Sequence, residues 1–572
     1  MSKNFYPGVV PDWAHDAVWY QIFPERFRNG CPQSNPQRED VTDHPIANWC
    51  VTPWGQDWYR PDDWAPKGEH AFWGVLARRY GGDLVGVREK LDYIQDLGIN
   101  AIYLNPIFMA RSLHKYDGAS FHHIDPTFGP DRAGDLALLA EVRETEDPKT
   151  WVWTAADRFF LELVKDVHAR GVRIIIDGVF NHCGREFFAF QDVLKHGKKS
   201  RYADWFRIKR WKRDGSFTYE GWWGHQSLPE FNRTKGNLIP PVREYIFNCT
   251  QRWMDPSGKG NPAIGIDGWR LDVAFCVPHG FWRDWRQHVK SINSEAYITA
   301  EIVEGCAPYL KGDQFDAVMN YEWLHAAIAY FKPGGKPISM TRFKHLLDRL
   351  CRKYPPEVMP VLQNLLDSHD VGRVSSVLEN AEQAANTPPD HFNVARVRQN
   401  PAFITTQPGE AAWQSLRQLT VFQMTYPGAP MIYYGNEVGM WGANDPDNRQ
   451  PMLWDDIEYE PETHGPAGKS LETSNPRQPD TELLAFFRRS IQMRKENEVL
   501  RRGDFSWLVT GRRQLLGFER RLGADRVVVL LNVSDRDMEF QLEQAVEDVW
   551  TPGVAWPAGS LMVPARGWRV VR

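Results

Sequence analysis

The chain has 572 residues, which is long enough for a large hydrophobic core and for more than one domain. Its 68 Lys and Arg nearly balance its 73 Asp and Glu, so it lacks the concentrated basic charge of nucleic-acid-binding proteins, and we expect no nucleic-acid partner. Its seven cysteines form no CxxC pair, no apolar run is long enough to span a membrane, and the N-terminus lacks a secretory pattern. We therefore expect a cytoplasmic protein that does not engage a membrane.

Short apolar runs alternate with helical patterns along the first 450 or so residues. This alternation indicates parallel strand pairing, and eight such units predict an α/β fold, a (β/α)8 TIM barrel with its chemistry on the loops after the strands. A doubly wound open sheet is the competing fold. The predicted strands are Val18–Phe23, Ala101–Asn105, Val172–Asp177, Gly268–Val273, Tyr297–Ile302, Ala317–Asn320, Val361–Leu366 and Met431–Tyr434.

Two aromatic-rich stretches interrupt the alternation. Residues 30–80, after the first strand, are predicted to form a long structured loop, and residues 183–235, after the third strand, an excursion domain over the barrel mouth. After about Glu498 short strands with turns predict a C-terminal antiparallel β-sandwich domain at 499–572. The remaining residues, 1–182 and 236–498, would form the catalytic barrel.

Three acids, Asp272, Glu301 and Asp370, stand at or just past the ends of strand-like runs that are far apart in sequence. A barrel brings such strand ends to one mouth. Two close carboxylates are what glycosidic bond cleavage needs, one as nucleophile and one as acid/base. The trio therefore predicts a sugar-cleaving enzyme if the three converge, and ordinary polar strand ends if they do not.

Arg270 lies two residues before Asp272, so both side chains point to the same face of a strand. A guanidinium in this position would lower the pKa of the acid and keep it ionised, as a nucleophile must be; a structural Arg–Asp pair is the alternative. Glu301 would need a raised pKa to act as a general acid, and burial beside other carboxylates would raise it.

Polar residues also follow two other strands. Asp177, Asn181 and His182 come after the third strand, where a neutral histidine could donate to a sugar hydroxyl; a turn with a hydrogen-bonded histidine is the alternative. His369 beside Asp370 invites a metal interpretation, but no second cluster of ligands at tight spacing supports it.

Together these motifs resemble the α-amylase superfamily of retaining glycoside hydrolases, and most of all its cyclomaltodextrinase, neopullulanase and maltogenic amylase branch. The resemblance runs from about Asp16 to Leu453. Besides the acids, it rests on AVWYQIFPERFRNG (Ala17–Gly30), INAIYLNPIF (Ile99–Phe108), HKYD (His114–Asp117), GDQFDAVMNY (Gly312–Tyr321) and GAPMIYYGNEVG (Gly428–Gly439).

The resemblance implies a role for each residue of the site. Asp272 resembles the nucleophile, Glu301 the acid/base, and Asp370 the acid that holds and distorts the sugar in subsite −1. An oligosaccharide is the implied partner, and no organic cofactor or catalytic metal is implied. The implied substrate-binding residues are Tyr116, His182, Arg270, His369, Asp445 and Arg449, with Asp177 and Asn181 in support.

Several positions depart from this branch. Val303 and Glu304 follow the acid/base where the branch has Trp and His, so the leaving-group side of the cleft is in doubt. Separately, Glu230 replaces a usual Lys. A solvated surface charge is the alternative for Glu230, and a loop salt bridge is the alternative for Asp445 with Arg449. The branch's N-terminal β domain has no counterpart before the barrel, which leaves monomer and homodimer open.

A calcium site that relatives build after the first strand aligns with Asn29, Asn35, Gly81 and Asp83. Cys31 replaces a usual Asp there, and sulfur is a poor ligand for a hard cation, so structural calcium is only a weak expectation.

The expected function is a retaining α-glucan hydrolase that cleaves α-1,4-glucosidic bonds of maltodextrins and cyclic maltooligosaccharides, with some transglycosylation and α-1,6 activity. The alternatives are a glucosyltransferase or isomerase that acts on maltose or sucrose and, more remotely, a catalytically inactive binding protein.

Overall fold

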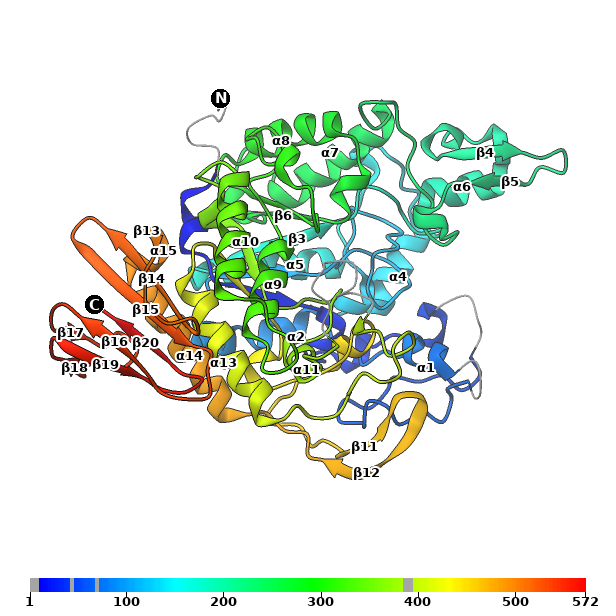
Figure 1. Ribbon diagram of the computed structural model, residues 1–572. Helices are drawn as coiled ribbons and strands as arrows, with labels where there is room; N and C mark the ends of the chain where they lie inside the picture. Colours follow the sequence, from blue (N-terminus) through cyan, green and yellow to red (C-terminus); the bar gives the residue numbers. More distant parts are fainter. Residues whose placement is uncertain (1–9, 42–45, 67–70, 384–393) are drawn as a thin grey trace.

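Eight parallel strands form a closed barrel at the centre of the chain (Figure 1). They follow the order β8-β7-β6-β3-β2-β1-β10-β9, and a parallel bridge between Met319 and Gln363 joins the two outer strands. The predicted (β/α)8 barrel is therefore confirmed over the open sheet. The barrel strands are β1 (Trp19–Ile22), β2 (Ala101–Leu104), β3 (Arg173–Gly178), β6 (Gly268–Leu271), β7 (Tyr297–Ala300), β8 (Ala317–Val318), β9 (Gln363–Leu365) and β10 (Ala429–Tyr433).

The coordinates are a computed structural model that describes residues 10–41, 46–66, 71–383 and 394–572. None of the helices within these ranges is long and apolar enough to cross a membrane.

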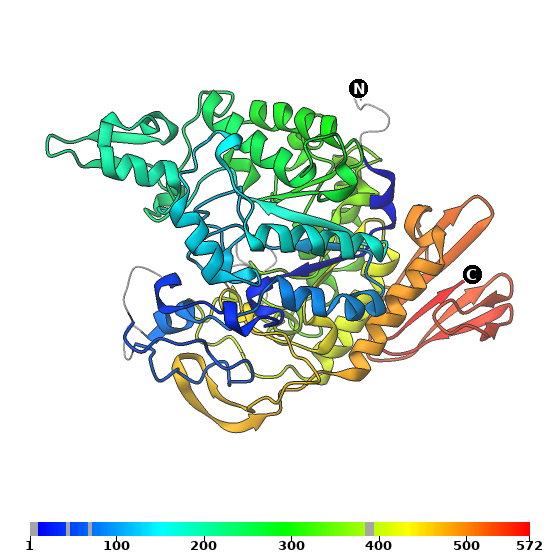
Figure 2. The same ribbon diagram turned by 180° about the vertical axis from the view of Figure 1, so that it is seen from behind.

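Helices cover the outside of the barrel (Figures 1 and 2). Strands that are buried on both faces have largely continuous apolar sequences. The strands β1, β2, β6 and β7 are buried at every residue, which explains the short apolar runs in the sequence. The helices around the barrel are α2 (Leu84–Glu89), α3 (Leu91–Leu97), α5 (Ala155–Ala169), α7 (Pro240–Met254), α8 (His279–Ile292), α9 (Tyr321–Phe331), α10 (Met340–Lys353), α11 (Val374–Glu379), α13 (Glu410–Thr425) and α14 (Thr481–Glu496).

Insertions stand over the carboxyl ends of the strands. After β3, residues 183–235 contain α6 (Phe188–His196) and a projecting hairpin of β4 (Ile208–Trp211) and β5 (Phe217–Tyr219), as Figure 1 shows. Backbone bridges at His182–Glu230 and Phe206–Phe231 fasten the base of this excursion. Two further short helices are α1 (Ala71–Ala77) and α4 (Arg132–Glu141), and a hairpin of β11 (Glu462–Gly465) and β12 (Lys469–Asn475) follows the last barrel strand.

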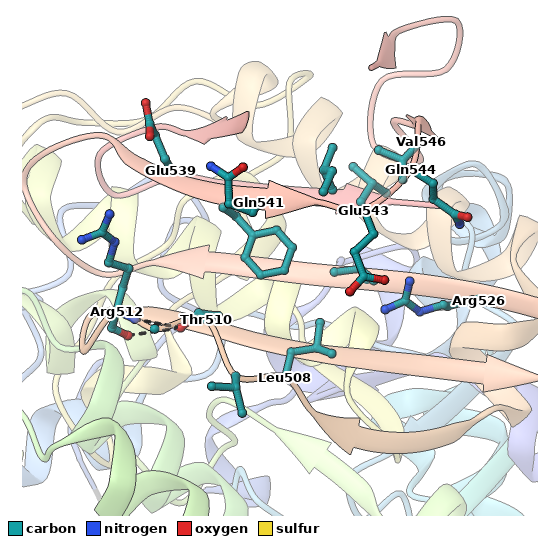
Figure 3. A pocket seen from close by; sticks show the side chains of 15 residues that line it. Leu508, Thr510, Arg512, Arg526, Glu539, Gln541, Glu543, Gln544 and Val546 are labelled. Carbon is teal, nitrogen blue, oxygen red and sulfur yellow. Dashed lines mark hydrogen bonds between the residues drawn. The ribbon is translucent and has the colours of Figure 1, made fainter. Parts of the chain in front are cut away.

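The C-terminal part is antiparallel and lies on the side of the barrel away from the β4–β5 hairpin in both views. After α15 (Glu498–Arg502), β13, β14, β15 and β20 form one sheet, β16 pairs with β19, and β17 pairs with β18. A groove of about 500 Å³ between these sheets is lined by residues such as Leu508, Arg526 and Phe540, and no predicted site residue lines it (Figure 3). The strands are β13 (Asp504–Trp507), β14 (Leu515–Leu522), β15 (Asp525–Asn532), β16 (Met538–Leu542), β17 (Val546–Glu547), β18 (Ala555–Trp556), β19 (Gly559–Val563) and β20 (Trp568–Val571).

Gly268 sets the spacing of β6 and β7, the strands that precede Asp272 and Glu301. Its φ of 153° and a position against the backbone of Tyr297 leave no room for a Cβ atom, which would overlap the Tyr297 carbonyl oxygen. Because backbone atoms cannot yield as a flexible side chain does, we expect Gly268→Ala to lower the free energy of unfolding by about 3 kcal/mol. The measurement is Tm by calorimetry. Gly334→Ala is the control because open space surrounds that Cβ position, and equal Tm values for the two variants would contradict this reading of the strand contact.

Candidate active site

One buried guanidinium brings the predicted acids together at the mouth of the barrel. Arg270 extends from β6 and is fully buried. Its Nη1 lies 2.9 Å from Asp177 Oδ2 and 3.1 Å from Asp272 Oδ1. Its Nη2 lies 2.9 Å from Glu301 Oε2 and 3.9 Å from Asp370 Oδ2. Four carboxylates from four strands or their loops therefore surround a single cation.

Asp272 and Glu301 stand side by side at the ends of β6 and β7. Leu271 pairs with Ala300 in the parallel register, so the next residue of each strand is one of the two acids. Neighbouring strands are about 4.8 Å apart, which matches the roughly 5–5.5 Å between the carboxyl groups of a retaining glycosidase. The carboxyl groups of an inverting pair stand further apart, at about 6.5–9.5 Å.

A strained residue follows Asp272 directly. Val273 has φ 37° and ψ 44°, in the left-handed region that a β-branched residue rarely occupies. In this conformation its N–H donates to Glu301 Oε2 at 3.1 Å. Strain of this kind persists where the surroundings over-determine the backbone, which is common at active sites. The turn thus orients the acid/base candidate from the strand that carries the nucleophile candidate.

The carboxyl groups hold a proton more tightly than isolated acids do. Burial and then the charge of Glu301 raise the pKa of Asp272, while Arg270 lowers it. The same two causes raise the pKa of Asp370 to about 7. Asp272 and Asp370 therefore hold a proton at a higher pH than isolated aspartates do. The expectation that Arg270 would keep the pKa of Asp272 low is wrong, because burial and the charge of Glu301 outweigh the guanidinium.

His369 and Tyr116 form a wall of the site. Their rings stack with centroids 5.5 Å apart and an angle of 9°. Gln21 Nε2 donates to His369 Nδ1 at 2.8 Å, which places the ring proton on Nε2, 2.6 Å from the Tyr116 hydroxyl and 3.1 Å from Asp370 Oδ2. The Tyr116 hydroxyl in turn donates to Asp177 Oδ2 at 2.9 Å. Burial keeps the pKa of His369 well below its usual range, so this network is held by a neutral imidazole.

Three polar residues that were not predicted complete this network. Tyr103 donates to Asp177 Oδ2 at 2.6 Å, Asn105 Nδ2 donates to the Tyr116 hydroxyl at 3.2 Å, and Gln21 Nε2 also donates to Asn105 Oδ1 at 3.0 Å. The sequence signal was a polar residue inside or next to an apolar strand, as Gln21 is within WYQI. These side chains fix the orientations of the predicted ones.

His182 lies at the mouth with an available ring nitrogen. It is 1% exposed, burial lowers its pKa to about 3, and its Nδ1 contacts Asn181 Nδ2 at 3.2 Å. Within the described part of the chain its Nε2 has no hydrogen-bond partner. A neutral, buried imidazole with an unused nitrogen is suited to a ligand hydroxyl.

Arg449 connects the loop after β10 to the acids. Its Nη1 lies 2.8 Å from Asp445 Oδ1, so the loop salt bridge that was considered for this pair does form. Its Nη2 is also 3.4 Å from Asp370 Oδ1, and its Nε donates to the carbonyl of His369 at 2.8 Å. The pair is therefore part of the site's rim as well as a loop contact.

Comparisons with known proteins show the family of this chain. A family model described as alpha amylase, catalytic domain, matches residues 21–146 and 155–503. This chain belongs to the alpha-amylase family. A cyclomaltodextrinase from Geobacillus thermopakistaniensis is 34% identical over 544 residues, which are 95% of this chain and 73% of the relative. Neopullulanase 2 from Thermoactinomyces vulgaris is 36% identical over 527 residues, 92% of this chain and 70% of the relative.

Solved structures of the alpha-amylase family share the whole architecture. The ligand-free cyclic alpha-maltosyl-(1→6)-maltose hydrolase from Arthrobacter globiformis has a TM-score of 0.70 and 27% sequence identity, and the match covers 98% of this chain and 99% of that chain. The protein is accordingly an enzyme, a glycoside hydrolase of this family, and the resemblance drawn from its motifs is confirmed.

One residue that departs from the pattern of the branch differs from its sequence interpretation. Glu230 is not a solvated surface charge: it is 7% exposed and forms ion pairs with Arg207 and Arg233. Arg233 also donates to the carbonyl of Cys276, in the loop after Asp272. The surface-charge interpretation was wrong because folding of the excursion brings both arginines, which belong to it, against Glu230. Of the two residues after Glu301-Ile302, Val303 is half-buried and Glu304 is exposed.

The residues aligned with a calcium site do not fit the ion. Asp83 accepts N–H groups of Gly30 at 3.2 Å, Cys31 at 2.8 Å and Gly86 at 2.6 Å, and so caps α2. Asn29 Nδ2 donates to Asn35 Oδ1 at 2.9 Å, and of these described residues Asn29 Oδ1 is left without a partner. Calcium takes 6–8 oxygen ligands. Here the loop is closed by hydrogen bonds, and Gly81 packs against both asparagines.

The shifted acid makes stability depend on pH. An aspartate in an unfolded chain has a pKa near 3.9, and that of Asp370 is about 7, so this group costs stability progressively as pH rises from about 4 to 7. We expect Asp370→Asn, which mimics the protonated acid, to leave Tm unchanged at pH 4 and to raise it at pH 8. Thermal melts at both values test this. Asp63→Asn, at an exposed loop residue, is the control. A Tm gain of the same size at both pH values would refute the titration argument.

Proposed function

We propose that this protein is a retaining α-glucan hydrolase that cleaves α-1,4-glucosidic bonds of maltodextrins and cyclic maltooligosaccharides. The observation that carries the proposal is the placement of Asp272 and Glu301 at adjacent strand ends on the two Nη atoms of Arg270. That spacing supports a covalent, retaining reaction.

The first step divides the work between these two acids. Glu301 donates its proton to the glycosidic oxygen while the Asp272 carboxylate attacks the anomeric carbon. The bond to the leaving sugar breaks, and a β-glycosyl ester forms on Asp272. Arg270 holds Asp272 in place and balances the charge of the cluster, and His182 Nε2, His369 and Asp370 would hold hydroxyls of the reacting ring.

The second step reverses these roles. Deprotonated Glu301 removes a proton from water, the water oxygen attacks the anomeric carbon, and the ester with Asp272 breaks with the α configuration restored. A sugar hydroxyl in place of water would give transglycosylation. We include this side reaction, and some α-1,6 cleavage, because the relatives named above include a neopullulanase and a hydrolase of a (1→6)-linked cyclic maltosyl-maltose.

The surroundings of the site favour short or cyclic substrates. The excursion at 183–235 and the described parts of the loop at 30–80 both border the barrel mouth. Trp58 of that loop donates from Nε1 to Asp447 at 2.7 Å, which ties it to the segment after β10. We further propose a cytoplasmic enzyme, since all seven cysteines lie in described parts of the chain and are unpaired thiols.

A product panel tests the substrate class. Incubation with maltotriose, cyclodextrin, pullulan, panose and maltose, followed by chromatography, should give glucose and maltose from the α-1,4-linked substrates and a trisaccharide such as panose from pullulan, all released in the α configuration by NMR. Sucrose and maltose separate the transferase or isomerase alternative, which would give an isomeric disaccharide in place of hydrolysis products. If no α-glucoside is consumed, the substrate proposal is wrong.

Variants test the two catalytic residues. Asp272→Asn and Glu301→Gln should each lower kcat at least a thousandfold because each removes a group that forms or breaks a bond in the transition state. Glu357→Gln, at an exposed residue that the site does not include, is the matched control and should keep kcat within about twofold. Full hydrolytic activity in either of the first two would overturn the mechanism.

A further inference from the structure

An exposed tryptophan stands beside the mouth of the barrel at the tip of an aromatic stack. Trp223 is 73% exposed, which is unusual for so large an apolar side chain. Its ring lies 4.7 Å from that of Trp222 at an angle of 11°, and Trp222 stacks on His182 at 5.4 Å and 25°. The stack therefore begins at a buried residue of the catalytic site and ends in solvent.

The backbone holds this tryptophan in a costly conformation. Trp223 has φ 47° and ψ 30°, a left-handed conformation disfavoured for bulky residues. The turn around it is closed by backbone hydrogen bonds from Trp222 N to Leu228 O at 3.0 Å and from Gly224 N to Gly221 O at 2.8 Å. An exposed, apolar, strained residue in a rigid turn contributes little to the fold, and this combination is typical of a binding surface.

The stack lies on one defined side of the acids. His182 follows β3, and Trp222 also lies beside Cys276 in the loop after β6. The Asp445–Arg449 pair follows β10, which is separated from β3 by β1 and β2 along one arc of the barrel. The two features therefore lie at separate parts of the rim: β3 neighbours β6, which precedes Asp272, and β10 neighbours β9, which precedes Asp370. With the non-reducing side of a substrate at Asp445 and Arg449, as the family resemblance implies, the leaving group would extend toward the stack.

We propose that Trp222 and Trp223 form a stacking platform for the glucosyl ring on the leaving-group side of the scissile bond, so that Trp223 selects substrates and acceptors that carry a sugar there. The inference rests on the proposed α-glucan hydrolysis. The apolar face of a pyranose ring packs on an indole, and His182 Nε2 is placed to hold a hydroxyl at the inner end of the platform. Glu230, fixed by Arg207 and Arg233, braces the strand segment behind it.

The test compares two substrates that differ only on the leaving-group side. Maltotetraose places sugar there, whereas α-maltosyl fluoride leaves with fluoride alone. Trp223→Ala should lower kcat/KM for maltotetraose about tenfold and leave that for α-maltosyl fluoride within about twofold, and Trp223→Phe should recover most of the loss. Val509→Ala, at a 95% exposed residue of the C-terminal domain, is the control and should change neither value.

The outcomes separate this inference from the function on which it rests. A wild-type enzyme that cleaves α-glucans while Trp223→Ala shows no loss, or the same loss on both substrates, overturns the platform and leaves the hydrolase standing. A measurement of binding affinity tests the platform a second time and does not need turnover. Calorimetric titration of Asp272→Asn with maltotetraose should give an affinity that falls about tenfold when Trp223→Ala is added, and an unchanged affinity, or no binding at all, counts against the platform.

Discussion

The catalytic end of the barrel depends on one buried cation. The guanidinium of Arg270 is fully buried and could not stay charged there without partners, and it is paired with carboxylates that would themselves be costly to bury alone. Asp177 comes from β3, Asp272 from the end of β6 and Glu301 from the end of β7, so the ion cluster fixes the relative positions of three strand ends. The same contacts hold the proposed nucleophile and the proposed proton donor on the two Nη atoms of one guanidinium, which links the stability of this end of the barrel to its proposed chemistry.

Backbone strain and buried charge occur together at this end of the barrel. Val273 and Trp223 are both bulky residues in left-handed backbone conformations, one beside the acids and one at the rim. The raised pKa values of Asp272 and Asp370 show that the cluster also costs electrostatic free energy at neutral pH. The large barrel core offsets these costs in free energy. It contains fully buried tryptophans such as Trp253, Trp269 and Trp285. A stable scaffold thus supports a site whose strain and buried charge by themselves lower the stability of the fold, as is general for enzymes.

The sequence allowed the barrel, its eight strands and the convergence of the three acids to be predicted because each depends on local patterns: apolar runs, helical periodicity and an acid at each strand end. It did not reveal Gln21, Tyr103 and Asn105, since a polar residue within a strand shows its purpose only when its partner on another strand is known. Glu230 was misread as solvated for the same reason. Asp83 could have been recognised, because an Asp before a short helix is a common N-cap, and that role engages the carboxylate that a calcium ion would need.

Trapping of the glycosyl-enzyme ester tests the central claim, that Arg270 presents Asp272 as the nucleophile, most directly. The enzyme would be incubated with 5-fluoro-α-glucosyl fluoride, whose ring fluorine slows both steps while the fluoride leaving group lets the first proceed. Mass spectrometry of the peptic digest should then find one fluoroglucosyl group on the peptide that contains Asp272, with the modification on that residue. A label on Asp370 or Glu301 instead, or turnover of α-glucans without any covalent adduct, would contradict the account.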